Sequence, residues 1–193
     1  MPELHQPQHH VRLVTASSLF DGHDASINIM RRIFQSQGCE VIHLGHNRSV
    51  GEVITAVVQE DVQGVAVSSY QGGHLEYFSY LVERLRERGA GHVRVYGGGG
   101  GVIVPDEIAT LAERGVHIFS PQDGQRLGLP GMINQLIAEC DVDLSASGAD
   151  LAGLLAGSES AVARGLTVLE AGADPAFAEK VRSSAAACHG CRY

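Results

Sequence analysis

The chain has 193 residues, 44% of them hydrophobic, which is enough for one domain of ordinary size with an appendage. Its formal charge of −8 and its single lysine, Lys180, disfavour a nucleic-acid-binding protein, because such proteins normally present a basic face. No Gly-Lys-Ser/Thr sequence is present, so the many glycines do not form a Walker-type phosphate loop.

Neither a membrane nor a secreted location is indicated. No hydrophobic run approaches the length of a membrane span, and the chain does not begin with a signal-peptide pattern. The four cysteines are too sparse for a secreted disulfide scaffold, so a cytoplasmic location is expected. Cys188 and Cys191 have C-x-x-C spacing, but one such pair cannot complete a four-ligand zinc site, and we interpret it as part of a tail. Residues 1–10 are polar and are expected to form a disordered lead-in.

The first predicted strand and helix enclose a polar turn. Residues 11–16 are mostly apolar and rich in β-branched side chains, which predicts a buried strand. Apolar residues then recur at helical spacing from Ile27 until Gly38, a typical helix stop. Residues 21–26 lie between the two elements, at the edge of an α/β sheet where ligands bind.

Four more strands alternate with four more helices in the sequence. The predicted strands cover residues 40–44, 64–68, 93–96 and 116–119, and the predicted helices cover residues 49–60, 75–88, 105 to about 115, and 125 to about 140. Ser49 and Glu52 match a capping box, and Pro105 suits the first turn of a helix. This alternation implies a doubly wound α/β fold with a parallel sheet, and five strands favour the flavodoxin-like order 2-1-3-4-5.

The composition changes after this α/β region. Residues 141–157 are rich in Ala, Ser, Gly and Asp, which is typical of a linker. Two short amphipathic helices are predicted beyond it, at residues 159–171 and 175–187, and they are too small to fold alone. We therefore expect one domain over residues 11–141, followed by a linker and a helical segment over residues 142–193.

Three polar or glycine-rich loops are predicted to converge at one edge of the sheet. They follow the first, third and fourth strands and carry Asp21 with His23, residues 68–74, and the five glycines at 97–101. The order 2-1-3-4-5 has its switch point between the first and third strands, which brings these loops together. A carboxylate two residues before a histidine can accept one ring N–H and leave the other nitrogen free for a metal. Glycines there let a large ligand approach the backbone.

Taken together, the three loops resemble the cobalamin-binding signature of the adenosylcobalamin-dependent acyl-CoA mutase family. That signature combines D-x-H-x-x-G, S-x-L and G-G, and the matching residues are Asp21-x-His23-x-x-Ser26, Ser68-x-Tyr70 and the glycine run. The resemblance covers residues 11 to about 138. Ser26 replaces the family's Gly and Tyr70 its Leu, and both departures are features of the fused isobutyryl-CoA mutase branch, to which the resemblance is closest.

This resemblance implies that the chain binds adenosylcobalamin with His23 on cobalt, replacing the cofactor's own dimethylbenzimidazole. Asp21 would hydrogen-bond His23, and the displaced nucleotide tail would lie between the first and third strands, where Ser68 would bond the benzimidazole. A side chain added at Gly99 or Gly100 would enter this slot or force a backbone shift. The implied cofactor-binding residues are Asp21, Gly22, His23, Asp24, Ala25, Ser26, Ile27, Ser68, Tyr70, Gly72, Gly98, Gly99, Gly100, Phe119 and Ser120, with His23 as the metal ligand.

The resemblance further implies that the chain is the cobalamin module of an isomerase that converts isobutyryl-CoA to n-butyryl-CoA. The substrate barrel of such enzymes needs about 250 residues. This chain has no room for it, so no catalytic residue is expected here and the chain alone should be inactive. The implied partners are that barrel and a GTPase chaperone domain, in the same chain or as separate subunits. The C-terminal helices resemble the opening segment of the chaperone domain.

Three other protein classes share part of the pattern. A free-standing cobalamin carrier or sensor would have the same binding residues, and only a substrate barrel elsewhere would distinguish the two. A response-regulator receiver has the same fold but needs a lysine after the fifth strand, and Lys180 lies far beyond that point. A flavodoxin-like FMN binder would use a Ser/Thr-rich loop such as residues 15–18, but it would leave the Asp21–His23 pair unexplained.

Overall fold

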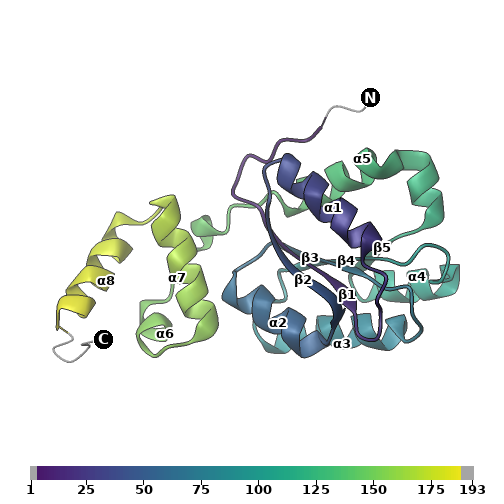
Figure 1. Ribbon diagram of the computed structural model, residues 1–193. Helices are drawn as coiled ribbons and strands as arrows, with labels where there is room; N and C mark the ends of the chain where they lie inside the picture. The colour runs from purple at the N-terminus through teal and green to yellow at the C-terminus, as the bar shows by residue number, and fades with distance from the viewer. Residues whose placement is uncertain (1–3, 188–193) are drawn as a thin grey trace. The chain divides into compact units, whose positions relative to one another are not determined.

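The computed structural model of the chain describes residues 4–187. The chain divides into two compact units, Met1–Val142 and Asp143–Tyr193. Figure 1 shows a sheet with helices around it in the first unit and helices in the second.

The first unit alternates strands and helices, as the sequence predicts. Its strands are β1 (Arg12–Ser18), β2 (Glu40–Arg48), β3 (Gly64–Ser68), β4 (Arg94–Gly98) and β5 (Val116–Phe119). Its helices are α1 (Ala25–Ser36), α2 (Val50–Gln59), α3 (His74–Glu87), α4 (Pro105–Glu113) and α5 (Pro121–Cys140). The predicted capping box of Ser49 and Glu52 is present at α2, and Pro105 opens α4.

The five strands form one parallel sheet in the order β2-β1-β3-β4-β5, which confirms the predicted flavodoxin-like topology. Within it, Val14 of β1 pairs with Ile42 of β2 on one side and with Val65 of β3 on the other. The loops after β1 and β3 are therefore neighbours, although α1, β2 and α2 separate them in sequence. This is the switch point where α/β sheets bind ligands.

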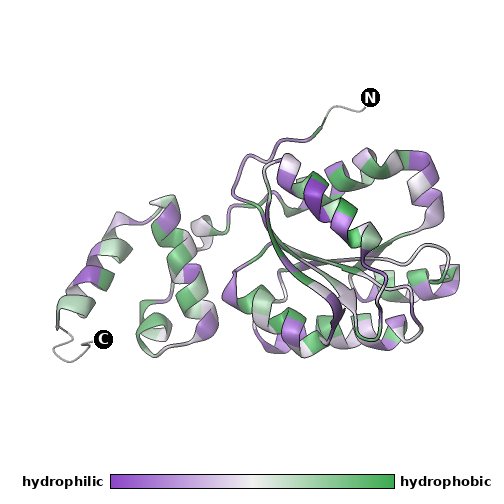
Figure 2. Cartoon of the chain, viewed as in Figure 1, coloured by the Kyte–Doolittle hydropathy of each residue, from purple (hydrophilic) through white to green (hydrophobic). Residues whose placement is uncertain are grey.

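Helices cover both faces of the sheet, α1 and α5 on one face and α2, α3 and α4 on the other (Figure 1). Alternate residues of a strand therefore enter two different cores: Val14 packs on the α2–α4 side, and Leu13 packs on the α1 and α5 side. The strand β3 is buried along its whole length. Figure 2 shows hydrophilic and hydrophobic residues alternating along the helices.

Several elements differ from the sequence prediction. The strand β4 extends to Gly98 instead of ending at residue 96, so Gly97 and Gly98 lie in the strand and not in the predicted loop. Residues 145–147 and 151–155, in the stretch predicted as a linker, are helical. The strand β2 continues to Arg48 instead of ending at residue 44, because Ser18 pairs with Arg48 after two shifts in the register. The helix α5 begins at Pro121 instead of residue 125, since Ser120 and Asp123 form a capping box there. This helix bends at Gly128, which has non-helical dihedral angles.

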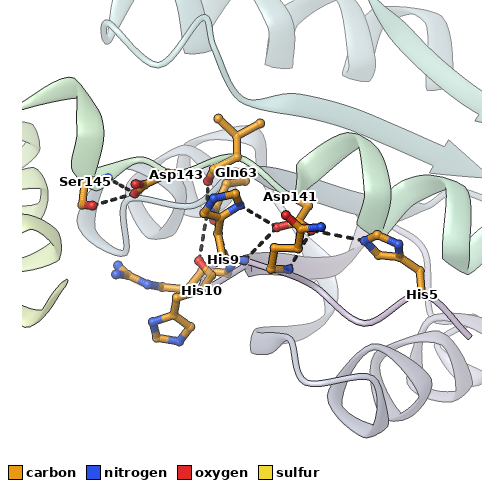
Figure 3. Close-up of polar contacts among 10 residues, drawn as sticks. His5, His9, His10, Gln63, Asp141, Asp143 and Ser145 are labelled. Atoms are coloured by element: carbon orange, nitrogen blue, oxygen red, sulfur yellow. Dashed lines mark hydrogen bonds and ion pairs between the residues drawn. The ribbon is translucent and has the colours of Figure 1, made fainter.

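Residues 4–10 contact the end of α5, whereas their composition predicts a disordered lead-in. The Asp141 carboxylate accepts the backbone N–H groups of Gln8 at 2.8 Å and His9 at 2.9 Å. The ring nitrogens of His5 and His9 lie 3.2 Å and 2.9 Å from the same carboxylate, as Figure 3 shows. Burial raises the pKa of Asp141, but these hydrogen bonds outweigh it, and the pKa is lowered overall.

Gln63 connects the two ends of the first unit, at the amino edge of the sheet. Its side-chain Nε2 donates to the carbonyl of His10 at 2.8 Å and to the carbonyl of Val142 at 3.1 Å. Its Oε1 accepts the backbone N–H of Arg12 at 2.8 Å. One side chain thus holds the segment that leads into β1 beside the segment that leaves α5.

The second unit contains the helices η1 (Ser145–Ser147), α6 (Leu151–Leu155), α7 (Glu159–Ala171) and α8 (Pro175–Ala187). Val168 and Phe177 are buried within it. The predicted tail pair Cys188 and Cys191 lies outside the described residues. Across residues 4–187, none of the helices combines the length and the apolar character needed to cross a membrane.

Candidate functional site

Three loops meet at the carboxyl edge of the sheet: residues 19–24 after β1, 69–73 after β3 and 99–104 after β4. The loop after β3 contacts the last residues of both neighbouring strands, β1 and β4. Ser69 donates its backbone N–H to the carbonyl of Gly98 at 2.7 Å, and its hydroxyl accepts that of Ser18 at 3.0 Å. The predicted convergence of these loops is therefore confirmed.

Asp21 is a fully buried carboxylate that joins two of the loops. Its Oδ1 accepts the backbone N–H of His23 at 2.8 Å and lies 2.8 Å from Nδ1 of the same residue. Its Oδ2 accepts the backbone N–H of Tyr70 at 2.5 Å. The carboxylate therefore fixes both the conformation of its own turn and the position of the loop after β3.

His23 presents its imidazole to solvent, with 65% of the side chain exposed. Because an ionised carboxylate can only accept, the proton of the neutral ring is assigned to Nδ1, and in that form Nε2 carries the lone pair. Within residues 4–187 no hydrogen-bond partner is found for this Nε2. A histidine whose Nδ1 is hydrogen-bonded to a carboxylate and whose Nε2 faces solvent can coordinate a metal through Nε2. No group of three or more His, Cys, Asp or Glu side chains in the described chain is arranged to hold a metal ion by itself.

A second contact supports the same turn from β2. Phe20 donates its backbone N–H to Oδ1 of Asn47 at 2.8 Å, and Asn47 donates its own N–H to the carbonyl of Asp21 at 3.1 Å. Both Phe20 (φ 65°) and Asn47 (φ 56°) adopt the left-handed conformation that L-residues rarely take. The sequence does not point to Asn47, because its polar surroundings suggest a loop beyond the strand.

A cavity of about 370 Å³ extends from these loops into the core between the sheet and the helices α1 and α5. Nine of the predicted cofactor-binding residues line it: Ser26, Ile27, Ser68, Tyr70, Gly98, Gly99, Gly100, Phe119 and Ser120. The others do not line it: Asp21, Gly22, His23, Asp24, Ala25 and Gly72. Of these, Asp21 and His23 lie beside its outer end, since the ring of His23 is 5.7 Å from that of Tyr70.

The inner end of the cavity is mostly apolar. Tyr96 forms part of it, with its ring parallel to that of Phe119 at a centroid distance of 6.2 Å. The Tyr96 hydroxyl donates to Glu139 at 2.8 Å, and burial raises the pKa of Tyr96. Ser68 is hydrogen-bonded to Ser17 at 2.8 Å. Several lining residues could not be recognised from the sequence, because buried apolar side chains look like ordinary core: Met30, Ala66, Tyr96, Leu129, Met132 and Leu136.

The glycines after Tyr96 face different surroundings. A methyl group built at Gly98 would meet only the Phe119 carbonyl oxygen, at 3.8 Å, so this glycine leaves space in the cavity. One built at Gly99 would collide with the carbonyl oxygen of Ser69. Of the two outcomes predicted for a side chain at Gly99, the structure gives the backbone shift.

His74, the first residue of α3, links the loop after β3 to Glu107 in the first turn of α4. Its buried ring places Nε2 2.7 Å from Oε2 of Glu107 and Nδ1 3.3 Å from the carbonyl of Gln71. Glu107 also accepts the backbone N–H of Val104 at 3.0 Å. The hydrogen bond from Val104 and, to a smaller extent, the one with His74 lower the pKa of Glu107. The backbone around the cavity is thereby fixed on both sides of the glycine run.

A family model and several known proteins are similar to this region of the chain. A family model described as B12 binding domain matches residues 11–124. A fused isobutyryl-CoA mutase of Nocardia farcinica is 68% identical over 173 residues, which are 90% of this chain and 16% of that protein. The 2-hydroxyisobutanoyl-CoA mutase small subunit of Aquincola tertiaricarbonis is 33% identical over 129 residues, which are 66% of this chain and 93% of that protein.

Among solved structures, the methanol:cobalamin methyltransferase complex of Methanosarcina barkeri resembles this chain with a TM-score of 0.52 at 20% identity. The similarity covers 69% of this chain and 48% of that chain. At this level of identity it supports the fold alone. This chain spans about a sixth of the length of the fused relatives that it matches.

Proposed function

Because the chain belongs to the B12-binding domain family, we propose that it binds adenosylcobalamin with Nε2 of His23 on cobalt and the nucleotide tail in the cavity. One observation carries this proposal. The buried Asp21 carboxylate is hydrogen-bonded to Nδ1 of His23, an exposed histidine at the outer end of an apolar cavity.

The chemistry of His23 fits this role. A neutral imidazole binds a metal through the ring nitrogen that carries no proton, and a carboxylate on the other nitrogen raises its basicity. Asp21 has no solvent exposure, and Tyr70 donates to its other oxygen, so this carboxylate cannot easily turn away. It therefore acts as a positioning residue for His23.

The cavity fits the nucleotide tail in size and in chemistry. Its volume of about 370 Å³ falls within the range of small-molecule pockets. The inner lining offers aromatic and aliphatic surface to a benzimidazole ring, and Ser68 supplies a hydroxyl there. Gly98 leaves open the space that a side chain would fill. These features support a slot for a flat, mostly apolar base.

We further propose that the chain is the cobalamin module of an acyl-CoA carbon-skeleton mutase acting on isobutyryl-CoA to give n-butyryl-CoA. When bound, adenosylcobalamin supplies a radical through homolysis of its cobalt–carbon bond. The residues of this chain hold and orient the cofactor. The substrate would occupy a barrel of about 250 residues, so this chain alone is expected to show no turnover.

The partners that follow are the mutase barrel and a GTPase chaperone domain, in one chain with this module or as separate subunits. The fused relatives, of which the chain matches about a sixth, support the first arrangement. The small-subunit relative, matched over 93% of its length, supports the second for the barrel. The GTPase partner rests on the resemblance of the C-terminal helices alone.

An electron paramagnetic resonance experiment tests the cobalt ligand. The chain is prepared with ¹⁵N-labelled histidine and loaded with Co(II) cobalamin. A protein nitrogen on cobalt then splits the signal as a spin-½ nucleus, whereas the benzimidazole nitrogen of the cofactor splits it as a spin-1 nucleus. We expect the ¹⁵N pattern for the wild type and its loss in His23→Ala. His46→Ala, which changes an exposed histidine of β2, is the matched control and should behave as the wild type. A benzimidazole pattern in the wild type would refute the assignment.

A further inference from the structure

Ser26 and Tyr70, the two departures from the family pattern, bond each other. The Ser26 hydroxyl in the first turn of α1 lies 2.9 Å from the hydroxyl of Tyr70, which follows β3. The two residues are 44 positions apart in sequence, and both line the cavity. The bond therefore connects two different walls of one cavity.

This bond lies at the outer end of the cavity. Ser26 is exposed and Tyr70 is partly exposed, whereas Ala66, Tyr96 and Leu136 at the inner end are buried. The next residue along α1 that faces the cavity, Ile27, is also buried. A ligand that enters from the carboxyl edge must pass the exposed residues first.

The ring of Tyr70 extends from one side of this outer end to the other. Its hydroxyl is hydrogen-bonded to Ser26 of α1, and its ring centroid is 5.7 Å from that of the His23 ring. A methyl group built at Gly100, in the loop after β4, would come within 3.2 Å of Cε1 of Tyr70. The ring thus reaches from α1 to the loop after β4, directly beside the proposed cobalt ligand.

The backbone on either side of this ring is held in place. Tyr70 donates its N–H to Asp21, and Ser69 donates its N–H to the carbonyl of Gly98 at 2.7 Å. The hydrogen bond of His74 with Glu107 fixes the same loop from its other end. Rotation of the Tyr70 side chain is therefore the motion that opens this end of the cavity with the fewest bonds broken.

We propose that Ser26 and Tyr70 form a latch across the mouth of the cavity, which opens by rotation of the Tyr70 side chain to admit the nucleotide tail. This inference rests on the proposed function, because it takes the tail as the group that enters. Opening breaks one hydroxyl–hydroxyl hydrogen bond, so loss of that bond should speed tail insertion by roughly two- to tenfold. A corrinoid without a tail does not use the latch.

Stopped-flow absorbance with the full 193-residue chain tests the latch. Adenosylcobalamin and adenosylcobinamide, which lacks the nucleotide tail, are mixed with the wild type, Tyr70→Phe, Ser26→Ala and the double variant. We expect each variant to bind adenosylcobalamin roughly two- to tenfold faster than the wild type. The double variant should match the single ones, since all three remove the same bond. Adenosylcobinamide should bind every protein at the same rate.

Tyr80→Phe is the matched control, because it removes the hydroxyl of an exposed tyrosine of α3 that does not line the cavity. Unchanged association rates in all variants would overturn the latch while leaving cobalamin binding intact. Faster dissociation without faster association would also overturn it, since the hydroxyls would then serve the bound tail. A wild type that gives no spectral change with either ligand would refute the proposed function, and the latch with it.

Discussion

Tyr70 donates its backbone N–H to Oδ2 of Asp21 at 2.5 Å, across 49 positions of sequence. The other oxygen of the same carboxylate holds His23. The spacing of two residues suggests that Asp21 serves only the histidine. The structure adds that it sets the distance between the histidine and the wall of the cavity.

Replacing Asp21 should therefore affect binding and folding together. Asp21→Ala is expected to weaken adenosylcobalamin binding by about 10- to 100-fold, as for other residues that orient a metal ligand. It should also lower the free energy of unfolding by about 1–3 kcal/mol, because the N–H groups of His23 and Tyr70 lose their acceptor. Absorbance titration and urea denaturation measure the two effects. Asp21→Asn retains one acceptor oxygen and should lie between Ala and wild type. Equal affinities and equal free energies of unfolding for all three proteins would show that Asp21 plays no part in the site.

Gly98 is expected to be the glycine that the tail requires. Gly98→Val places a side chain in the cavity and should reduce affinity for adenosylcobalamin by about 5- to 150-fold, the cost of overpacking a filled site. Affinity for adenosylcobinamide should not change, because that ligand has no tail. Gly101→Ala is the control, since a methyl group there meets no atom within 4 Å. Equal losses for both ligands would mean that Gly98 faces the corrin ring.

The neighbouring Gly97 should instead be required for folding. A methyl group there would lie 2.5 Å from Cδ1 of Ile118 and 2.6 Å from Cζ of Phe78, in the core on the other face of the sheet. Gly97→Ala is therefore expected to lower the free energy of unfolding by about 1–3 kcal/mol. The same change at Gly98 should have little effect on stability. Urea denaturation of the two variants side by side checks this, and similar losses would contradict the alternation of faces.

Asp123 should make the start of α5 sensitive to acid. The Ser120 hydroxyl, then Arg126 and the Ser120 N–H, lower the pKa of Asp123 to about 2 from its usual 3.8. Because the folded pKa lies below the unfolded one, the unfolded chain binds more protons between these values. The stabilisation is complete above about pH 4 and is lost as the pH falls toward 2. Asp123→Asn should cost about 1 kcal/mol at pH 6, typical of a helix cap, and much less near pH 2.5. Urea midpoints at both pH values test this, and a difference that does not vary with pH would argue against it.

The sheet and the Asp21–His23 turn could be predicted because each depends on local pattern. Buried parallel strands are short apolar runs, and a carboxylate two residues from a histidine meets it within a single turn. The topology then followed from the strand count. These are the features that the structure reproduces most closely.

Contacts between distant segments could not be predicted in the same way. Ser26 and Tyr70 each depart from the family pattern, but only the folded arrangement of α1 beside β3 shows that they bond each other. Asn47 was missed because Gly45 and its polar neighbours interrupt the apolar pattern of β2. Tyr96 was missed because a cavity wall and a packed core use the same kinds of side chain.

The two hydrogen bonds from Gln63 to His10 and Val142 bring the start and the end of the α/β unit together. Gln63 precedes β3 at the amino edge, and the five residues of β3 separate it from the loop of Tyr70 by roughly 16 Å. Adjacent ends favour circular permutation and insertion into a host protein. A permuted chain, with residues 10 and 142 joined by a short peptide and new termini in the exposed turn of residues 88–89 after α3, should keep the cofactor edge intact. The α/β unit could then be inserted into a host protein through two adjacent ends that lie far from the ligand-binding edge.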